Sequence, residues 1–495
     1  MCKYHLAIDI GSESGRAFVG YLDSGTLVCD EIYRFKTQFT QVREYSIRNI
    51  YGYLDEIINS MRIYKDKYGD ELGSIGVDAW GSDFVLVGRT GDILKLPSSY
   101  RLSSVSTDVS SIVEERYGQK DLYYLNGNQH MPADTLHQLL RLQQSNDPSI
   151  DDPQGILFIA DIFHYLLGGR LCCEHSLASY CRLFNAEKDT WDLDAFRAFD
   201  IPETICTEIV HPGTCTGYVS RNILLEAGLK EPVPIIIPCS HDTACAALSV
   251  ADPGEDWAFI SSGTWSLLGT ETEKPVINDI AYINNYSNSS MPLKTNMFKK
   301  IITGTWIIQQ CAKAWGIKDY NEIVNLADAA KDQNCFIDIN GTEFYAPDSM
   351  PRAISNAVKR DYSVDVPEND IGQISRIVFQ SMALRYRYYL EQLIKATGKE
   401  INKIYILGGG SRNRLINAFT ASACNRVVSV GVYEASSVGN LLLQAYGCHE
   451  LKDKQEMRKT VMASFPQTLY FPSDKKLWDD KYAAFLSRAI QYNEF

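Results

Sequence analysis

The chain lacks the segments that direct a protein into or across a membrane. Residues 1–5 show no basic start, apolar stretch or small-residue cleavage site of a secretory leader. No apolar run approaches the ~20 residues that a bilayer span requires. These absences lead us to expect a soluble, cytoplasmic protein with no membrane partner.

Cysteines at metal-ligand spacing are also absent. The 13 cysteines are scattered, and no CxxC motif occurs among them. The one close pair, Cys172-Cys173, is adjacent in sequence, which is poor geometry for a disulfide or a zinc site. We expect most of these cysteines to be small, buried apolar side chains.

Basic residues are also fewer than acidic residues. The sequence has 48 Lys and Arg against 61 Asp and Glu, a formal net charge of −13. Such a surface repels nucleic-acid phosphates, so we expect no nucleic-acid partner. The Gly-Lys-Ser/Thr ending of a Walker loop and an opening GxGxxG motif are both missing, which disfavours a P-loop enzyme and a nicotinamide-dependent dehydrogenase.

What the sequence does contain is an ordinary globular composition in two similar halves. It has 495 residues, 45% apolar and 22% charged, enough for two to four domains. Strand patterns cover 6–10, 16–22, 26–35, 74–78 and 84–87, with a helix at 50–64. The strand–turn–strand pattern restarts at 257–260 and 265–269, followed by a strand at 404–407, a helix at about 412–423 and a strand at 426–430. This order indicates an α/β fold whose halves divide near residues 246–254.

Two turns rich in Gly and Ser occupy corresponding places in the two halves. The first, Asp9-Ile10-Gly11-Ser12-Glu13-Ser14-Gly15-Arg16, offers turn amides and hydroxyls to phosphate, and Asp9 could hold Mg²⁺. The second is Ser261-Ser262-Gly263-Thr264. Taken alone, each segment is equally typical of a plain hairpin turn, where Gly and Ser are common. Their pairing favours a phosphate group held between two lobes.

Three further segments carry chemistry. Gly408-Gly409-Gly410 ends a strand before a helix, where backbone amides can bind an anion. In Ser240-His241-Asp242-Thr243, Asp242 could accept a proton from a hydroxyl, although a helix cap is an equally good reading. In Asp78-Ala79-Trp80-Gly81-Ser82-Asp83, the ring and carboxylates suit a sugar, with a core Trp as the alternative.

Together these segments resemble the FGGY family of carbohydrate kinases, from Asp9 to at least Gln444. Each match is weak alone, but their order over more than 400 residues is specific. The closest likeness is to the branch of the family that phosphorylates L-rhamnulose. Besides the segments above, the matches are His211-Pro212-Gly213, Ser261-Ser262-Gly263-Thr264-Trp265-Ser266, Gly408-Gly409-Gly410-Ser411-Arg412-Asn413 and Glu434-Ala435-Ser436-Ser437-Val438-Gly439-Asn440.

The resemblance implies two actin-like (ribonuclease-H-like) domains with ATP and a sugar in the cleft between them. It implies an ATP-dependent kinase, with Mg²⁺ at Asp9 and Asp242 as catalytic base. Residues 1–248 would bind the sugar, and residues 249–495 the nucleotide. Sugar contacts would be Trp80, Gly81, Asp83, His241, Asp242 and Thr243, and ATP contacts Ser12, Glu13, Ser14, Gly15, Arg16, Thr264, Gln309, Gly409, Gly410 and Asn413.

Two positions depart from the pattern of that branch. Ile301 stands where an Asn contacts the sugar, and Leu102-Ser103-Ser104 replaces an Asp and a second Arg after Tyr100-Arg101. An apolar side chain cannot make the hydrogen bonds of an amide, so the accepted sugar can change. The prediction is a kinase of the 1-hydroxyl of a 6-deoxy-ketohexose, L-rhamnulose or L-fuculose.

Other readings of the same fold stay open. One is a kinase of another ketose such as xylulose, and another is a non-catalytic actin-fold sensor of sugar or ATP. Asp242 in its motif favours the kinase, since a sensor needs no base beside the sugar. For the assembly we expect a monomer or a homodimer.

Overall fold

The computed structural model describes residues 3–11, 13–37, 39–42, 45–98 and 109–488. Ser12 and Leu102-Ser103-Ser104, which the sequence singled out, lie outside these ranges. The chain divides into two compact units. The first unit comprises Met1–Pro253, Glu271–Phe298 and Ala435–Phe465, and the second comprises Gly254–Thr270, Lys299–Glu434 and Pro466–Phe495. The predicted division into 1–248 and 249–495 stays a prediction.

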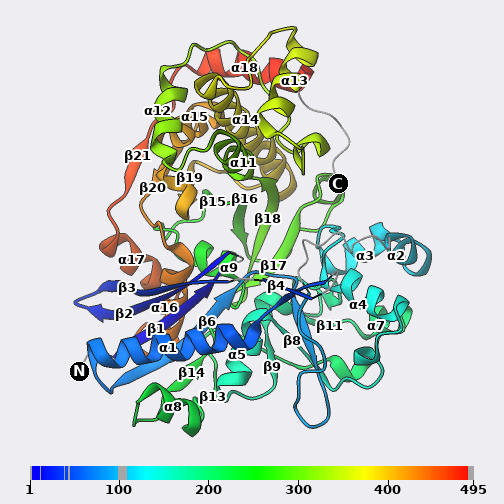
Figure 1. Cartoon of the computed structure of the whole chain (residues 1–495), viewed down its shortest axis with the longest axis vertical. Helices are drawn as coiled ribbons and strands as arrows, with labels where there is room; N and C mark the ends of the chain where they lie inside the picture. Colours follow the sequence, from blue (N-terminus) through cyan, green and yellow to red (C-terminus); the bar gives the residue numbers. More distant parts are fainter. Residues whose placement is uncertain (1–2, 12, 38, 43–44, 99–108, 489–495) are drawn as a thin grey trace. The chain divides into compact units, whose positions relative to one another are not determined.

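The first unit is built on a six-stranded mixed sheet in the order β13-β14-β6-β1-β2-β3 (Figure 1). β1 pairs in parallel with β6 and antiparallel with β2, which turns back into β3. The strands predicted at 6–10, 16–22, 26–35 and 74–78 are confirmed. Their bounds are β1 (Tyr4–Ile10), β2 (Ser14–Asp23), β3 (Thr26–Lys36), β6 (Leu72–Ala79), β13 (Cys215–Tyr218) and β14 (Pro234–Ile236).

Helices cover both faces of this sheet. Side chains alternate along a strand, so Leu6 and Ile8 of β1 point to the same side and join the core formed with α1 (Ile50–Tyr68), the helix predicted at 50–64. On the opposite face lies α16 (Ala435–Gly447), so close that a Cβ on Gly20 would stand 2.6 Å from the side chain of Leu441. The polar end of β1, Asp9, therefore faces α16 and not the apolar core.

Apart from β17, the remaining described strands of the first unit pair in small separate sheets, β4-β5, β7-β8, β9-β12 and β10-β11. β7 at 84–87, as predicted, pairs antiparallel with β8. The short strands are β4 (Phe39–Val42), β5 (Tyr45–Arg48), β7 (Phe84–Val87), β8 (Gly155–Phe158), β9 (Cys172–Glu174), β10 (Phe184–Asn185), β11 (Thr190–Trp191), β12 (Glu208–Val210) and β17 (Ser287–Met291). The helices are α2 (Ser110–Arg116), α3 (Gln119–Asn126), α4 (Thr135–Gln144), α5 (Ile159–Leu167), α6 (His175–Ala178), α7 (Leu193–Ala198), α8 (Arg221–Ala227), α9 (Asp242–Leu248), α10 (Asp279–Ile283) and α17 (Lys454–Ser464).

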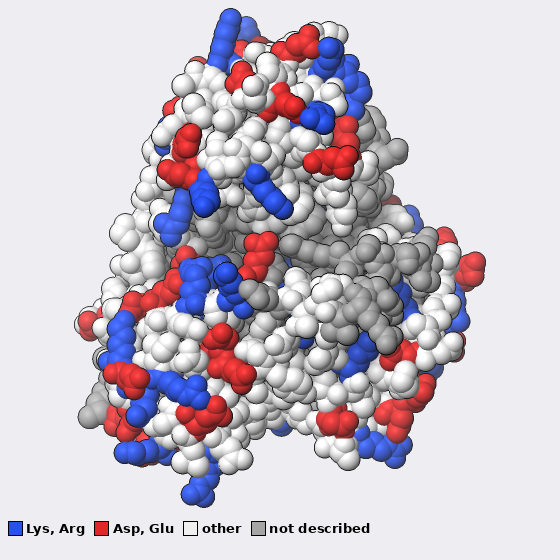
Figure 2. All heavy atoms as spheres, viewed as in Figure 1, with Lys and Arg blue, Asp and Glu red and all other residues white. Residues whose placement is uncertain are grey.

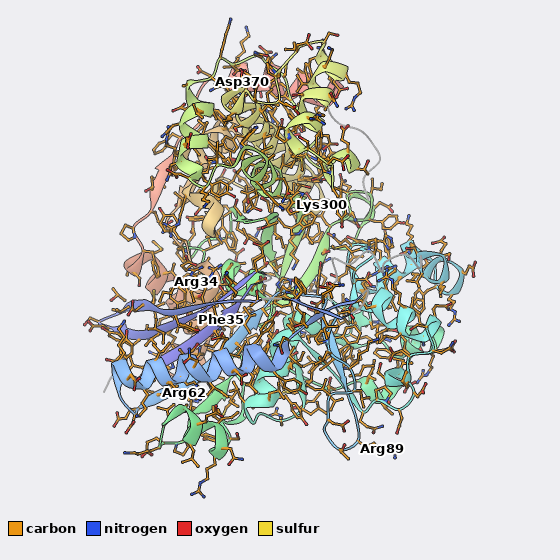
Figure 3. The ribbon with its side chains drawn as sticks, in the orientation of Figure 1. Arg34, Phe35, Arg62, Arg89, Lys300 and Asp370 are labelled. Carbon is orange, nitrogen blue, oxygen red and sulfur yellow. The ribbon has the colours of Figure 1, made fainter. Side chains whose placement is uncertain are left out.

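The first turn of the sheet is closed by a glycine. Gly11 N–H donates to Ser14 O at 3.0 Å, and Thr37 N–H donates to Glu13 O at 3.2 Å. Gly15 follows at the start of β2, where a Cβ would stand 2.1 Å from the ring of Phe35, labelled on β3 in Figure 3. Any larger side chain at position 15 would displace that ring, so the ring and the glycine fix the path of the turn together.

The second unit repeats this sheet order. The sheet order is β17-β18-β16-β15-β19-β20-β21, with β15 antiparallel to β16 and parallel to β19, and β17 is an additional edge strand. β15 therefore corresponds to β1, β16 to β2 and β19 to β6, which confirms two α/β domains of similar design. The bounds are β15 (Trp257–Ser262), β16 (Trp265–Thr272), β18 (Thr295–Thr303), β19 (Lys403–Leu407), β20 (Val427–Val430) and β21 (Thr468–Tyr470).

The helices of the second unit pack around one long, mostly buried helix. This helix, α14 (Ile371–Thr397), lies beside α12 (Tyr320–Ala329) and α15 (Arg414–Cys424) in Figure 1. Tyr386 anchors it, because its hydroxyl lies 2.7 Å from Ser266 Oγ on β16. The other helices are α11 (Trp306–Trp315), α13 (Met350–Tyr362) and α18 (Lys475–Arg488).

Three properties of the described residues concern surface charge, membrane-spanning helices and cysteine state. Acidic and basic side chains are interspersed over the face that Figure 2 shows. Within the described ranges, no helix has the length and hydropathy that a bilayer span requires. The twelve cysteines that lie in those ranges are all free thiols.

Candidate active site

Three carboxylates of the first unit stand at the ends of neighbouring elements. Asp9 on β1 and Asp78 on β6 are directly opposite each other in the parallel pair. The next residue of β6, Ala79, forms a bridge with His241, which immediately precedes Asp242 and α9. The carboxyl ends of parallel strands are where α/β folds place their ligands, so these three residues define the candidate site.

Asp9 is held by hydroxyl groups from α16. Ser436 Oγ donates to Asp9 Oδ2 at 2.7 Å, and Ser437 Oγ lies 3.4 Å from the same oxygen. Arg16, half-buried on β2, approaches with Nη1 at 3.9 Å from Asp9 Oδ2. The carboxylate is therefore fixed in orientation, with a cation at ion-pair distance.

Asp78 is wholly buried and only partly satisfied. Its Oδ2 accepts from Asn440 Nδ2 at 2.7 Å, and its Oδ1 is buried with no hydrogen-bond partner among the described residues. Burial raises the pKa of Asp78 well above its usual range, and the negative charge of Asp9 adds to the rise. A buried carboxylate with a vacant oxygen destabilises the fold, which is typical of a group kept for function.

Asp242 is the first residue of α9, and the helix cap is His241. Its Oδ1 accepts from His241 Nδ1 at 2.9 Å, from Thr243 N at 2.5 Å and from Thr243 Oγ1 at 3.1 Å. Burial acts to raise the pKa of Asp242, but the hydrogen bonds from His241 and Thr243 outweigh it and hold the pKa below its ordinary value. The side chain of Asp242, 32% exposed, is thus an ionised carboxylate open to solvent.

The residues at this end of the sheet fit a magnesium ion. Mg²⁺ prefers carboxylate oxygens and retains part of its water shell. Asp9 and Asp78 supply two facing carboxylates, and the vacant Oδ1 of Asp78 is an unused ligand atom. The described residues contain no cluster of three or more His, Cys, Asp or Glu side chains at metal-ligand spacing, so a metal would also need water or phosphate ligands.

At Gly81 the chain passes close to Tyr180 and His241. A Cβ at Gly81 would stand 3.1 Å from the ring of Tyr180 and 3.3 Å from His241 Nε2. Tyr180 and His241 meet edge to face, with 5.5 Å between ring centroids. The sequence pattern did not single out Tyr180, because nothing local marks a Tyr that folding brings beside a distant histidine.

Trp80 and Asp83 lie deeper than the other predicted sugar contacts. Trp80 Nε1 donates to Asp83 Oδ2 at 2.9 Å, and the guanidinium carbon of Arg48 lies 4.1 Å from the centroid of the Trp80 ring. Arg48 and Asp83 are both fully buried, with Arg48 Nε 3.5 Å from Asp83 Oδ2. This geometry suits a support for the strand end that carries Asp78 and Gly81.

In the second unit, the predicted nucleotide residues Thr264 and Gln309 come together. Thr264 Oγ1 lies 3.4 Å from Gln309 Oε1 on α11, and Gln309 Nε2 donates to Thr305 Oγ1 at 3.1 Å. The turn at 263–264 is closed from the same side, because Thr305 N donates to Gly263 O at 2.9 Å. Ser261 and Ser262, predicted as part of the turn, belong to strand β15.

The helix predicted at about 412–423 is α15 (Arg414–Cys424), and a short 3₁₀ turn precedes it. The 3₁₀ turn, Gly409–Arg412, contains the last two of the three glycines. Asn413 Oδ1 then caps α15 by accepting from Leu415 N and Ile416 N. A Cβ on Gly410 would stand 2.2 Å from Ser262 Oγ, whereas one on Gly409 would meet open space. Gly410 therefore lets this loop touch the end of β15.

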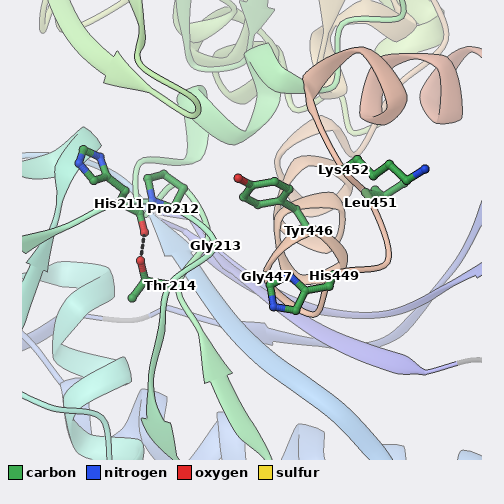
Figure 4. Close-up of a pocket in the computed structure, with 9 residues that line it drawn as sticks. All are labelled: His211, Pro212, Gly213, Thr214, Tyr446, Gly447, His449, Leu451 and Lys452. Carbon is green, nitrogen blue, oxygen red and sulfur yellow. Dashed lines mark hydrogen bonds between the residues drawn. The ribbon is translucent and has the colours of Figure 1, made fainter.

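The motif His211-Pro212-Gly213 forms a pocket of its own in the first unit (Figure 4). Gly213 has φ +87° and would place a Cβ 2.7 Å from the ring of Tyr446, so only glycine fits. The space is about 580 Å³. Its lining also includes Thr214, Gly447, His449, Leu451 and Lys452.

The chain thus has two sheets of one design, one with carboxylates near its strand ends and the other with glycine and hydroxyl groups. The sequence profile of the FGGY family of carbohydrate kinases, N-terminal domain, matches residues 4–249. The C-terminal domain profile of the same family matches residues 258–448. The chain belongs to this family and is a sugar kinase, with ATP as co-substrate and a small sugar as acceptor.

Among characterised proteins, the chain is similar to rhamnulokinases over nearly its whole length. It is 33% identical over 485 residues to the rhamnulokinase of Bacteroides thetaiotaomicron, covering 98% of this chain and 99% of that protein. It is 34% identical over 493 residues to that of Enterococcus faecalis, covering 98% of each.

Solved structures share the fold at low sequence identity. A ligand-bound xylulose kinase from Lactobacillus acidophilus superposes with a TM-score of 0.82 at 14% identity, over 98% of this chain and 97% of that one. Plasmodium falciparum glycerol kinase with ADP gives 0.79 at 16% identity, over 99% of each chain. These matches confirm the predicted two-domain α/β fold.

Proposed function

We propose that the chain transfers the γ-phosphoryl group of ATP to the 1-hydroxyl of a 6-deoxy-ketohexose, L-rhamnulose or L-fuculose. The observation that carries the proposal is Asp242, an ionised and accessible carboxylate next to the facing pair Asp9 and Asp78. Phosphoryl transfer needs mainly positioning and charge neutralisation, which such a group of residues supplies.

Asp242 acts as the general base in this proposal. All three hydrogen bonds that its side chain receives from the described residues end on Oδ1, which leaves Oδ2 for the attacking hydroxyl. The lowered pKa keeps the carboxylate ionised at neutral pH, so it can accept the proton as that oxygen attacks phosphorus. Gly81, His241 and Thr243 surround it and would contact the sugar, with Trp80 and Asp83 beneath.

Asp9 and Asp78 would hold Mg²⁺, which neutralises phosphate charge when bound. Arg16 stands beside Asp9, and Glu13 in the turn, with Ser14 and Gly15 at the start of β2, would lie next to the phosphates. Asp78 has an unused oxygen, and Asp9 is oriented by Ser436. Both residues therefore bind and orient, and neither takes a proton from the sugar in this scheme.

The second unit would bind the nucleotide. Thr264 and Gln309 stand together at the end of β15, and the Gly409–Gly410 loop touches the same strand end. Backbone amides of such a turn donate well to phosphate oxygens. Asn413 shapes the loop as the cap of α15 and contributes to the site through that turn.

The 6-deoxy-ketohexose follows from the rhamnulokinase relatives, which match 95–98% of this chain at 31–34% identity. Ile301 on β18, half-buried, carries no hydrogen-bonding group at the position where that branch has an Asn sugar contact. L-fuculose therefore stands beside L-rhamnulose as acceptor. A cytoplasmic location and a monomeric or homodimeric state stay predictions.

The test is ADP formation with MgATP against L-rhamnulose, L-fuculose, D-xylulose, L-ribulose and glycerol. We expect sugar-dependent turnover with one 6-deoxy-ketose, and a kcat/KM at least ~10-fold above that for the other acceptors. An Ile301→Asn variant should shift preference toward L-rhamnulose if L-fuculose is the better substrate of the native chain. Higher kcat/KM with D-xylulose or glycerol would reject the proposed acceptor class.

A further inference from the structure

A buried carboxylate lies behind the segment that carries Asp242. Glu174 is the last residue of β9 and has no exposed surface. Its Oε2 accepts from Ser240 N at 2.9 Å and from Ser176 Oγ at 2.5 Å. The backbone just before the proposed base is therefore tied to this side chain.

The hydrogen bonds continue from Glu174 to the base itself. Ser176 Oγ accepts from His241 N at 3.1 Å, and His241 Nδ1 lies 2.9 Å from Asp242 Oδ1. On its other side the segment is bound to the sheet, because Ala79 N donates to Ser240 O at 2.9 Å. Residues 240–241 are thus held between a strand and a buried carboxylate, and both fix where Asp242 points.

Glu174 is a costly residue to bury. Its Oε1 has no hydrogen-bond partner among the described residues, and no cation there forms an ion pair with it. Asp161 on α5 stands nearby, where its Oδ1 accepts from Ser240 Oγ at 3.2 Å and from Glu174 N at 3.3 Å. Burial raises the pKa of Glu174 to about 7. A site evolved only for stability would fill this space with an apolar side chain.

We propose that Glu174 is a positioning residue for the phosphoryl transfer, acting through Ser240, Ser176 and His241 on the orientation of Asp242. The inference rests on the proposed role of Asp242 as base. Without Glu174, the Ser240 N–H would be buried and unpaired, and the segment would relax away from α6. A shift of about 1 Å in a catalytic group can lower turnover by ~10²-fold.

The experiment compares Glu174→Leu and Glu174→Gln with the native chain, with Asp192→Leu as a matched control. Asp192 is another buried acid of the first unit, whose oxygens accept from Ala195 N and Asn185 Nδ2 at the start of α7. We expect Glu174→Leu to lower kcat by ~10²-fold with KM for sugar and ATP within ~3-fold. The amide oxygen of Glu174→Gln can still accept from Ser240 and Ser176, so kcat should return to within ~5-fold of native.

Thermal unfolding of each variant separates positioning from stability. Asp192→Leu should lower Tm while leaving kcat near the native value. The proposal is overturned if Glu174→Leu keeps native kcat, or if Asp192→Leu loses as much. If Glu174→Leu does not fold, Ser176→Ala is the second variant, because it removes both the hydroxyl that donates to Glu174 Oε2 and the acceptor for His241 N. An unchanged kcat in Ser176→Ala would overturn the proposal as well. A fully active Asp242→Asn variant would reject the base assignment instead, independently of Glu174.

Discussion

At the scale of single residues, the site depends on three acids with different environments. Asp9 is bound by hydroxyl groups, Asp78 is buried with one free oxygen, and Asp242 is partly exposed and hydrogen-bonded on one oxygen. The same functional group therefore has a raised pKa at Asp78 and a lowered pKa at Asp242. Asp78 therefore retains its proton to higher pH, whereas Asp242 is ionised and can accept a proton.

The Asp242→Asn variant tests the proton-accepting role. The amide keeps the size and the bond from Thr243 but cannot take a proton, so we expect kcat to fall by ~10²–10⁴-fold. ATP binding, measured by calorimetry, should stay near native because the change is in the first unit. Turnover within a few-fold of native would assign the proton to another group.

The Asp78→Asn variant tests the effect of the raised pKa of Asp78 on stability. Because folding raises the pKa of Asp78, the folded state holds this proton more tightly, and stability is lost as pH rises through the ordinary carboxyl range toward the raised value. The amide removes that loss, so unfolding free energy at pH 7 should rise by about 0.5–2 kcal/mol. Denaturation at pH 4 and pH 7 measures the difference.

The same Asp78→Asn variant should lose activity, since an amide is a weaker ligand for Mg²⁺. We expect a ~10–100-fold higher Mg²⁺ requirement in turnover assays. A variant as active as the native chain at limiting Mg²⁺ would remove Asp78 from the metal site. The combination of a more stable and less active protein is what a buried functional acid predicts.

At the scale of elements, α9 and α16 touch through a glycine. A Cβ on Gly439 would stand 2.0 Å from the backbone oxygen of Cys245, so the two helices pack at backbone contact. Since α9 begins at Asp242 and α16 carries Ser436 and Asn440, this contact sets the spacing of the site.

The Gly439→Ala variant should therefore separate the two helices. We expect a loss of unfolding free energy of about 1–3 kcal/mol, together with lower kcat, because backbone cannot move aside as a side chain can. Gly409→Ala is the matched control, since its Cβ meets open space and stability should be unchanged. Equal stability of both variants in denaturant titrations would contradict the close packing.

The periodic elements could be predicted from sequence, and the contacts between distant segments could not. Apolar runs bounded by Gly and Asp indicated β1, β2 and β19 to within a few residues. The 3₁₀ turn after Gly408 was missed, because a glycine run has no periodicity to read. Glu174 and Asn440 were given no role, since only folding brings them to Ser240 and Asp78.

At the scale of the whole molecule, the two sheets share one strand order and differ in the residues at their strand ends. Asp9 is the next-to-last residue of β1 in the first unit, whereas Ser261 and Ser262 end β15 in the second. The common scaffold could be read from the repeated strand–turn–strand pattern. The different chemistry at equivalent positions follows from a few residues at each strand end.

Nucleotide binding should stabilise the whole protein. A non-hydrolysable ATP analogue at 100 times its Kd adds about 2.7 kcal/mol to the unfolding free energy of the cooperative unit that contains the nucleotide site. We expect Tm to rise with the analogue and Mg²⁺, and to rise less for Gly410→Ala, whose Cβ would collide with Ser262 Oγ. An equal rise for this variant would place the nucleotide elsewhere.

The discontinuous make-up of the first unit has a consequence for biosynthesis. Its sheet leaves the ribosome early. The helix α16, however, is synthesised only after residue 434, and it covers one face of that sheet and carries Asn440, the partner of Asp78. At ~5–20 residues per second, the last part of this unit emerges roughly 10–40 s after residue 253. During that interval one face of the sheet is uncovered. The first unit therefore depends on chaperones longer than the second, and a chain that terminates before residue 435 cannot complete it.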